Sequence, residues 1–249
     1  MSESVPTFSI ITVTYNAEAT IEATMLSVRQ QTYRHLEHLI IDGASKDNTL
    51  YIINKNKDER TRVISESDHG LYDAMNKGIR LATGSYLCFL NAGDTFHEPD
   101  TLEKMVNGAG LLDNKDFPDI LYGQTAIVDA NRHFLRMRHH TAPEVLTWKS
   151  FQQGMLVCHQ AFFVKRTLAE PYDLQYKYSS DYDWCIRMMK KADVISNTHL
   201  ILIDYLDEGM TTRHHKASLL ERLRIMAKHY GWGKALLMHL WFVIRLAKR

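Results

Sequence analysis

The sequence has few cysteines, and they form no cluster. Cys88, Cys158 and Cys185 are widely spaced and odd in number. Disulfide frameworks and zinc sites require closely spaced sets of cysteines. The sequence therefore excludes a disulfide-stabilised secreted domain and a zinc module. A reducing, cytoplasmic compartment is expected.

Long hydrophobic runs and an excess of one charge are also absent. No segment is apolar over the roughly 20 residues that a membrane-spanning helix requires. The first residues, Met1 to Ser4, lack the basic and apolar regions of a signal peptide. A formal net charge of +1 gives no overall field that would attract nucleic acid, so we expect no nucleic-acid partner.

What is present is an alternation of strand and helix patterns in the first hundred residues. The β-branched and aliphatic runs predict strands over 8–13, 36–41, 61–65 and 85–90. Helical spacing predicts helices over 17–31, 49–56 and 71–82, the first of them capped by Asn16. This order predicts an α/β fold with a mainly parallel sheet and right-handed crossovers.

The second half has a looser pattern. Helices are expected over 100–112 and 180–192, and strands over 120–129, 134–138, 162–164 and 195–203. The five prolines are scattered, and no repeat or linker stands out. We therefore predict a single domain over residues 1–217, divided into halves at about residue 97, and a helical tail over 218–249.

The tail has a composition of its own. Residues 218–229 alternate apolar and basic side chains at helical spacing, Gly231 to Gly233 interrupt the pattern, and 235–246 are mostly apolar. The apolar stretch is too short to span a bilayer but suits a helix lying in a membrane interface. A helix docked on the protein body and a homodimer contact are the alternatives.

Polar residues follow the predicted strands at their carboxyl ends. Thr14 and Asn16 follow the first strand, Asp42 follows the second, and Asn91 and Asp94 follow the fourth. Ligands bind at this edge of an open α/β sheet, so we expect a site for a polar, charged ligand. Asp94 could supply an oxygen to a hard cation, although turn formation is the ordinary role of such a residue.

An acidic loop leads into the third predicted helix. Glu66 and Asp68 lie in the loop, and Asp73, Asn76 and Lys77 share a face on neighbouring helical turns. Together with Asp42 and Asp94 this places many acids near one edge. Clustered negative charges are energetically unfavourable unless a cation or hydrogen-bond donors compensate them.

Four of these segments, in order, resemble the family 2 glycosyltransferases with the GT-A fold. They are Ser9 to Asn16, Ile41 to Asp47, Glu66 to Ile79 and Leu90 to Asp94. Asp73 to Ile79 and Asn91 to Asp94 are most similar to bacterial transferases of colanic acid, capsule and O-antigen assembly. The resemblance implies a nucleotide-sugar donor, with UDP-galactose, UDP-glucose or an N-acetyl variant favoured. It also implies a lipid-linked oligosaccharide acceptor and a Mn²⁺ or Mg²⁺ cofactor.

The resemblance also implies roles for residues of the first half. Asp42 would contact the base, and Glu66 and Asp68 would border the base and ribose. Asn91 and Asp94 occupy the metal motif, where Asn91 replaces the usual acid and Asp94 would bind the metal. The expected donor site comprises Thr14, Asn16, Asp42, Glu66, Asp68, Asp73, Asn76, Lys77, Asn91, His159, Gln160 and Arg213.

In the second half the resemblance implies a catalytic base before a helix. Asp181 is expected to be this base and Asp183 is the alternative, while helix capping is the ordinary role of such an aspartate. His159 and Gln160 would line the acceptor or the donor sugar, unless His159 is a core residue. The loop 209–216 would close over the diphosphate, with Arg213 on phosphate and His214 as a metal ligand.

Three functions remain in competition. The first is an inverting transferase that acts by a single, metal-assisted displacement. The second is a nucleotide-sugar-binding scaffold without transfer activity, which Asn91 favours and Asp94 with Asp181 oppose. The third, a nucleotidyltransferase, would need glycines and a lysine after the first strand, and residues 14–18 have neither.

Overall fold

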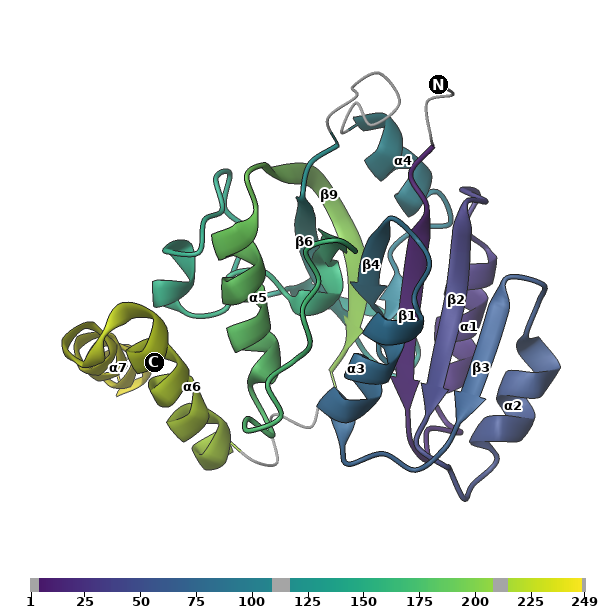
Figure 1. The fold of residues 1–249 in the computed structure, drawn as a ribbon, viewed down its shortest axis with the longest axis horizontal. Coiled ribbons are helices and arrows are strands. Elements are labelled where there is room, and N and C mark those ends of the chain that lie inside the picture. The colour runs from purple at the N-terminus through teal and green to yellow at the C-terminus, as the bar shows by residue number, and fades with distance from the viewer. Residues whose placement is uncertain (1–4, 109–116, 208–214, 248–249) are drawn as a thin grey trace.

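The computed structural model describes residues 5–108, 117–207 and 215–247. Within these ranges one nine-stranded sheet forms the centre, in the order β3-β2-β1-β4-β8-β6-β9-β5, with β7 paired to β6 (Figure 1). The strands are β1 (Phe8–Thr14), β2 (Leu36–Asp42), β3 (Thr61–Ser65), β4 (Tyr86–Phe89), β5 (Thr95–Phe96), β6 (Ile120–Val128), β7 (Phe134–Met137), β8 (Phe162–Lys165) and β9 (Ile195–Leu206).

The first four long strands are parallel, as predicted. They are joined by α1 (Ile21–Arg29), α2 (Thr49–Asn56) and α3 (Leu71–Leu81). Thr14 lies opposite Asp42, which lies opposite Ser65, so three strands end in register at one edge. This edge is where the sequence predicts the ligand site.

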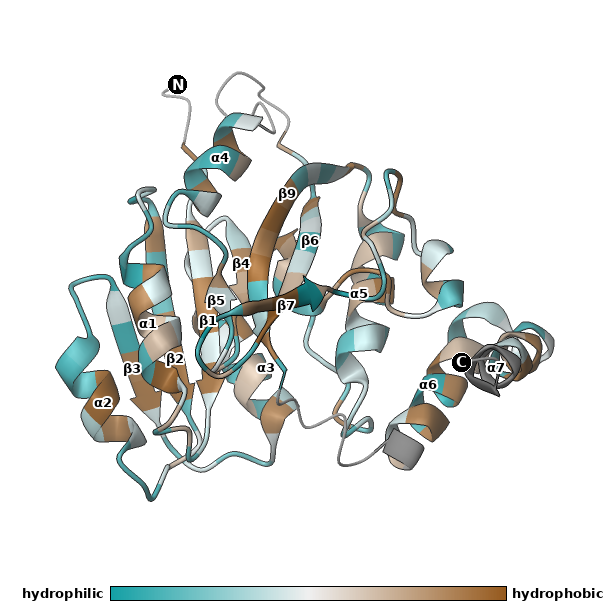
Figure 2. Ribbon diagram, turned by 180° about the vertical axis from the view of Figure 1, so that it is seen from behind, coloured by the Kyte–Doolittle hydropathy of each residue, from teal (hydrophilic) through white to brown (hydrophobic). Residues whose placement is uncertain are grey.

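The two faces of β2 are buried against different helices. Ile40 packs with Ile21 and Met25 of α1 and with Ile53 of α2. Leu39 and Ile41, on either side of Ile40 in the sequence, point to the opposite face, because alternate side chains of a strand face opposite ways. Both belong to the main core. Figures 1 and 2 show α1 and α3 on opposite sides of the sheet.

Beyond β4 the sheet is mixed. β8 is antiparallel to both β4 and β6, β9 is parallel to β6, and the short β5 is antiparallel to β9. The other elements are α4 (Thr101–Gly108), η1 (Ser150–Gln153), η2 (His159–Ala161) and α5 (Ser180–Lys191). β9 is three residues longer than predicted. Its end pairs with β5, which directly follows Asp94.

The predicted cap of the first helix is wrong. Asn16 has a positive φ of 48°, and α1 begins only at Ile21, after Thr20. The side chain of Asn16 accepts a hydrogen bond from Lys46 N instead of capping a helix. The fourth helix is observed to Gly108, and the remaining predicted residues 109–112 lie outside the described ranges.

The C-terminal segment forms α6 (His215–Tyr230) and α7 (Trp232–Ala247), separated at Gly231. Ile225 and Met226 of α6 are buried in the main core, and Tyr230 stacks on Trp148 at 5.5 Å. In the part of the chain that is described, no helix is long and apolar enough to cross a membrane. The tail was predicted to start at residue 218, and α6 begins slightly earlier, at His215. The predicted domain boundary at residue 217 stays a prediction.

Candidate functional site

The loops after β1 and β2 hold each other at the carboxyl edge of the sheet. Asn16 Oδ1 accepts from Lys46 N at 2.8 Å, and Asn16 N donates to Ser45 Oγ at 2.9 Å. Asp42 is fully buried, and its carboxylate accepts from Ser45 N at 3.0 Å, Ser45 Oγ at 2.5 Å and Ser65 Oγ at 2.6 Å. Asp42 thus organises this edge, and its contact with a base stays a prediction.

Three buried polar atoms in this region have no hydrogen-bond partner among the described residues. They are Thr14 Oγ1 at the end of β1, Asn91 Oδ1 after β4, and His159 Nε2 in η2. Buried polar atoms are almost always hydrogen-bonded, so unpartnered ones mark a place for a ligand or water. The structure thus supports a polar ligand at the edge where the sequence predicts one.

The acidic loop closes on the turn after β2. A Cβ atom at Gly43 would lie 2.6 Å from Asp68 Oδ2 and 3.3 Å from Tyr15 Cδ2, so a larger residue there would displace the Asp68 carboxylate. Tyr15 is 63% exposed and offers a flat ring beside this turn. The sequence-based prediction missed Tyr15, although an aromatic residue directly after a buried strand is a usable signal.

The charged residues of α3 hold the acidic loop. Lys77 is buried, lies 3.1 Å from Glu66 Oε1 and donates to the carbonyl of Ser67 at 2.7 Å. Asp73 accepts from His69 N at 3.0 Å. Lys77 and Asp73 therefore shape the loop that carries Glu66 and Asp68, and their direct contact with a donor stays a prediction.

Two predicted donor-binding amides are occupied within the protein. Asn76 exchanges two hydrogen bonds with the backbone of Tyr172, at 3.0 and 2.6 Å. Gln160 Nε2 donates to Asp94 Oδ2 at 2.8 Å, and Gln160 Oε1 accepts from Cys158 at 2.6 Å. Both side chains are framework residues in this structure, and we do not include them in the proposed donor site.

Asp94 is engaged within the protein, and its role as a metal ligand stays a prediction. It is 4% exposed, and while Gln160 donates to Oδ2, Leu206 N donates to Oδ1 at 3.2 Å. Burial raises the pKa of Asp94 to about 7, so the carboxylate is only partly charged near neutral pH. No group of three His, Cys, Asp or Glu side chains able to hold a metal occurs within the described ranges. The other predicted ligand, His214, and the predicted phosphate ligand Arg213 lie outside them.

Asp181 lies where α3 and α5 meet. Tyr72 OH donates to Asp181 Oδ1 at 3.1 Å, and His159 Nδ1 lies 3.6 Å from Oδ2, beyond hydrogen-bond distance. The carboxylate is 19% exposed, in the first turn of α5, and Ser179 occupies the cap position. Asp181 therefore has one oxygen held by Tyr72 and a side chain that stays partly exposed, as a general base requires.

His159 is buried beside this carboxylate. Burial lowers the pKa of His159, although the charge of Asp181 partly offsets this, so the imidazole is neutral at pH 7. Its Nε2 is one of the unpartnered atoms described above. A neutral imidazole there can exchange a hydrogen bond with a sugar hydroxyl.

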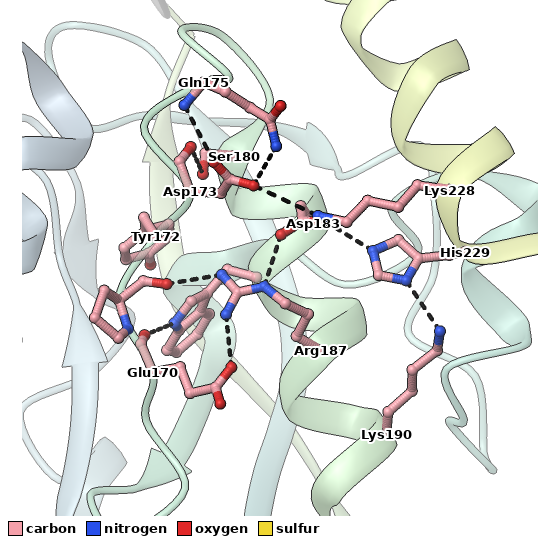
Figure 3. Close-up of polar contacts among 12 residues, drawn as sticks. Glu170, Tyr172, Asp173, Gln175, Ser180, Asp183, Arg187, Lys190, Lys228 and His229 are labelled. Atoms are coloured by element: carbon pink, nitrogen blue, oxygen red, sulfur yellow. Dashed lines mark hydrogen bonds and ion pairs between the residues drawn. The ribbon is translucent and has the colours of Figure 1, made fainter.

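Asp183, the alternative base, has a different position (Figure 3). It is fully buried and accepts from Arg187 Nε at 2.7 Å, His229 Nε2 at 2.8 Å and Lys228 Nζ at 3.2 Å. Burial alone would raise the pKa of Asp183, but these donors and the nearby cations hold it well below its usual range. Asp183 joins α5 to α6 and is inaccessible to an acceptor.

A further residue of α6 supports the base, and the sequence-based prediction missed it. Glu221 accepts three backbone hydrogen bonds, from Lys177 N, Tyr178 N and Ser179 N, at 2.8 to 2.9 Å. These residues directly precede α5, on which Asp181 lies. Glu221 is the only acidic residue between positions 215 and 249, and this isolation was the available signal.

Comparison with known proteins identifies the family to which this chain is related. Residues 9–172 match the family model described as Glycosyl transferase family 2. A Mycobacterium bovis protein named PGL/p-HBAD biosynthesis glycosyltransferase is 34% identical over 211 residues, covering 82% of this chain and 78% of the relative. The Escherichia coli UDP-Glc:alpha-D-GlcNAc-diphosphoundecaprenol beta-1,3-glucosyltransferase WfgD is 28% identical over 187 residues, covering 75% and 71%.

Solved structures share the fold at low sequence identity. Staphylococcus aureus TarS 1–349 in complex with UDP-GlcNAc has a TM-score of 0.66 at 18% identity, over 89% of this chain and 66% of that one. The mannosyltransferase PcManGT from Pyrobaculum calidifontis, in complex with GDP-Man and Mn²⁺, has a TM-score of 0.61 at 15% identity, over 94% and 74%. At these identities the likeness concerns the fold.

Proposed function

The chain belongs to glycosyl transferase family 2 and has the GT-A fold, and from this premise we propose that it transfers a sugar from a UDP-sugar to a hydroxyl of a lipid-linked oligosaccharide. Transfer inverts the anomeric carbon in a single displacement. Asp181 is the general base. The product belongs to bacterial surface polysaccharide synthesis.

The observation that carries this proposal is the setting of Asp181. Tyr72 donates a hydrogen bond to one oxygen of its carboxylate, and the side chain is 19% exposed. Tyr72 lies in the first turn of α3, which follows the carboxyl end of β3 and therefore begins at the donor edge of the sheet. Asp181 can thus face an acceptor bound beside a donor at that edge.

The chemical step follows from this arrangement. Asp181 takes the proton of the acceptor hydroxyl as its oxygen attacks the anomeric carbon. The bond from that carbon to the diphosphate breaks, and the electron pair leaves with the nucleoside diphosphate. The hydrogen bond from Tyr72 orients the carboxylate, and His159 Nε2 is available to a sugar hydroxyl.

Relatives support the choice of donor and acceptor. The E. coli relative is named for UDP-glucose and for a sugar linked to diphosphoundecaprenol, and TarS has been solved with UDP and with UDP-GlcNAc. In this chain, Tyr15, Asp68 and Thr14 would contact the base and ribose at the edge described above. We propose a UDP-sugar on these grounds.

A divalent cation, Mn²⁺ or Mg²⁺, stays a prediction for this chain. PcManGT has been solved with Mn²⁺, and in this chain the carboxylate of Asp94 accepts hydrogen bonds from Gln160 and Leu206. Asn91 Oδ1 is an unpartnered oxygen of the kind that hard cations accept. The step above therefore depends only on residues of the chain.

The alternative is a scaffold that binds a nucleotide-sugar without transferring it. Asn91 in place of an acid favours this alternative, whereas the accessible carboxylate of Asp181 opposes it. A panel of nucleotide-sugars, incubated with a lipid-linked acceptor in Mn²⁺, in Mg²⁺ and in chelator, distinguishes the two. Transfer with inverted configuration supports the enzyme, and tight UDP binding without turnover in any condition supports the scaffold.

A further inference from the structure

The outward side of α7 is apolar from Trp232 to Trp241, the part of the helix whose side chains are described. Five side chains define what we call the α7 outer face, and they are between 43% and 65% exposed: Trp232, Leu236, Leu237, Leu240 and Trp241. On the opposite side of the helix, Ala235 is fully buried in the core. An exposed apolar face of this extent marks a site of interaction.

The charge around this face has one sign. Residues 215–249 contain eight lysines and arginines and one acid, whereas the whole chain has a net charge of only +1. The single acid, Glu221, is engaged with backbone N–H groups of residues 177–179. The C-terminal segment is thus strongly basic, and the rest of the chain is correspondingly acidic.

The face is held in place by the protein body. Asp183 of α5 joins Lys228 and His229 of α6, and Tyr230 OH donates to the carbonyl of Trp148 at 2.6 Å. Figure 1 shows α6 and α7 beyond α5, at the opposite end of the molecule from β3. These contacts fix α6 on the body, and α7 follows after the short connection at Gly231.

We propose that the α7 outer face binds the surface of an anionic lipid bilayer. Exposed leucines with a tryptophan towards each end, flanked by basic residues and lacking acids, match a helix that lies in the interface plane. The lysines and arginines complement anionic headgroups. A second copy of the chain is disfavoured as the occupant, because a two-fold contact through this face would bring two strongly basic segments together.

The test is sedimentation of the full-length protein with vesicles. Wild type binds vesicles of phosphatidylglycerol and phosphatidylcholine and binds pure phosphatidylcholine weakly. The double variant Leu236→Gln/Leu240→Gln loses at least about ten-fold in affinity because two exposed leucines can no longer insert into the membrane interface. Raising salt from about 0.1 M to about 0.5 M weakens binding of wild type, because the Debye length falls.

Matched controls separate this face from general hydrophobicity. Val145 and Val194 are 74% and 50% exposed outside the C-terminal segment, and Val145→Gln/Val194→Gln retains vesicle binding. Failure of wild type to sediment with anionic vesicles overturns the proposal. So does a wild-type dimer, measured by sedimentation velocity, that Leu236→Gln/Leu240→Gln dissociates while vesicle binding is unchanged. Since lipid binding is the readout, the result is independent of the proposed reaction.

Discussion

The donor edge and the base are built in different ways. At the donor edge, Asp42 is held by Ser45, three residues away, and by Ser65 on the adjacent strand. Asp181 is held by Tyr72, 109 residues away, and its loop by Glu221 of α6, more than 40 residues away. The donor edge thus follows from a local strand and loop pattern, whereas the base depends on the docking of distant helices. Changes near the base should therefore alter turnover without altering donor affinity.

The largest effect is expected at Asp181. Asp181→Asn keeps the shape and the acceptor oxygen for Tyr72 but cannot take a proton, so kcat falls by about 10³-fold or more. Donor affinity, measured by calorimetry with UDP, stays within a factor of about two because the donor edge is untouched.

Tyr72→Phe provides the graded control for this substitution. It leaves Asp181 charged but removes one hydrogen bond, and we expect a smaller loss of kcat, about ten-fold. If Asp181→Asn retains a tenth or more of wild-type turnover, another group is the base and the comparison fails.

The next effect concerns Asp94, where the two halves meet between β4, η2 and the end of β9. Its pKa is about 7 in the folded protein and lies near 3.9 in unfolded chains, so the folded state binds the extra proton between these values. The contribution of this group to stability is present below about pH 4 and is lost as the pH rises through 7. It amounts to about 4 kcal/mol at most.

Asp94→Asn removes this contribution, and urea unfolding from pH 4.5 to 8 measures it. The difference in stability between wild type and variant should decline as the pH rises. His38 is buried with its pKa lowered to about 4 and acts with the opposite sign, but it is common to both proteins. A difference that is constant with pH would show that Asp94 is charged throughout, as a metal ligand would be.

A smaller loss of stability is expected at Asp183. In Asp183→Asn the ion pairs that the buried carboxylate makes with Arg187 and Lys228 are lost, which costs about 3 kcal/mol of unfolding free energy. Asp173→Asn is the control, since its carboxylate is 30% exposed and its pair with Lys228 at 3.4 Å contributes less than about 1 kcal/mol. Equal urea midpoints for the two variants would show that α6 is not fastened to α5 through Asp183.

The same comparison explains what could be predicted from the sequence. The parallel strands and the edge at which they end follow from alternating strand and helix patterns, and they are confirmed by the pairing of β1 to β4. The antiparallel insertion of β8 next to β4 does not follow from any local pattern, because it pairs residues nearly 80 positions apart. Sheet order in the second half is set by long-range contacts that a single sequence does not display.

Within the site, residue type was easier to predict than residue role. Asn76 and Gln160 have the chemistry of sugar-binding amides, but their partners are Tyr172 and Asp94, which lie far away in sequence. The predicted helix cap at Asn16 failed because the side chain of Asn16 is engaged with Lys46 N of the neighbouring loop. Asp73 was predicted for the donor site, and its observed partner, His69 N, lies only four residues away in the sequence.

The smallest effect is expected at Glu221, and it tests most directly whether the base depends on a distant helix. In Glu221→Gln one of the two oxygens that receive Lys177 N, Tyr178 N and Ser179 N becomes an NH₂ group. At least one of these charge-assisted bonds is lost, and the loop before Asp181 loosens. We expect kcat to fall about ten-fold while the KM for the donor is unchanged.

A merely structural role for Glu221 would lower the folded fraction and nothing else. Titrating active sites with UDP therefore normalises kcat to folded protein, and the decrease should persist after normalisation. The pH profile of kcat should also shift, because Asp181 and Tyr72 no longer hold their spacing. Arg224→Gln, an exposed position one helical turn along α6, is the control and should leave kcat unchanged. The normalised kcat and the pH profile of Glu221→Gln could instead match those of wild type. In that case α6 stabilises the chain without influencing the base, and the donor edge and the base differ less than their contacts indicate.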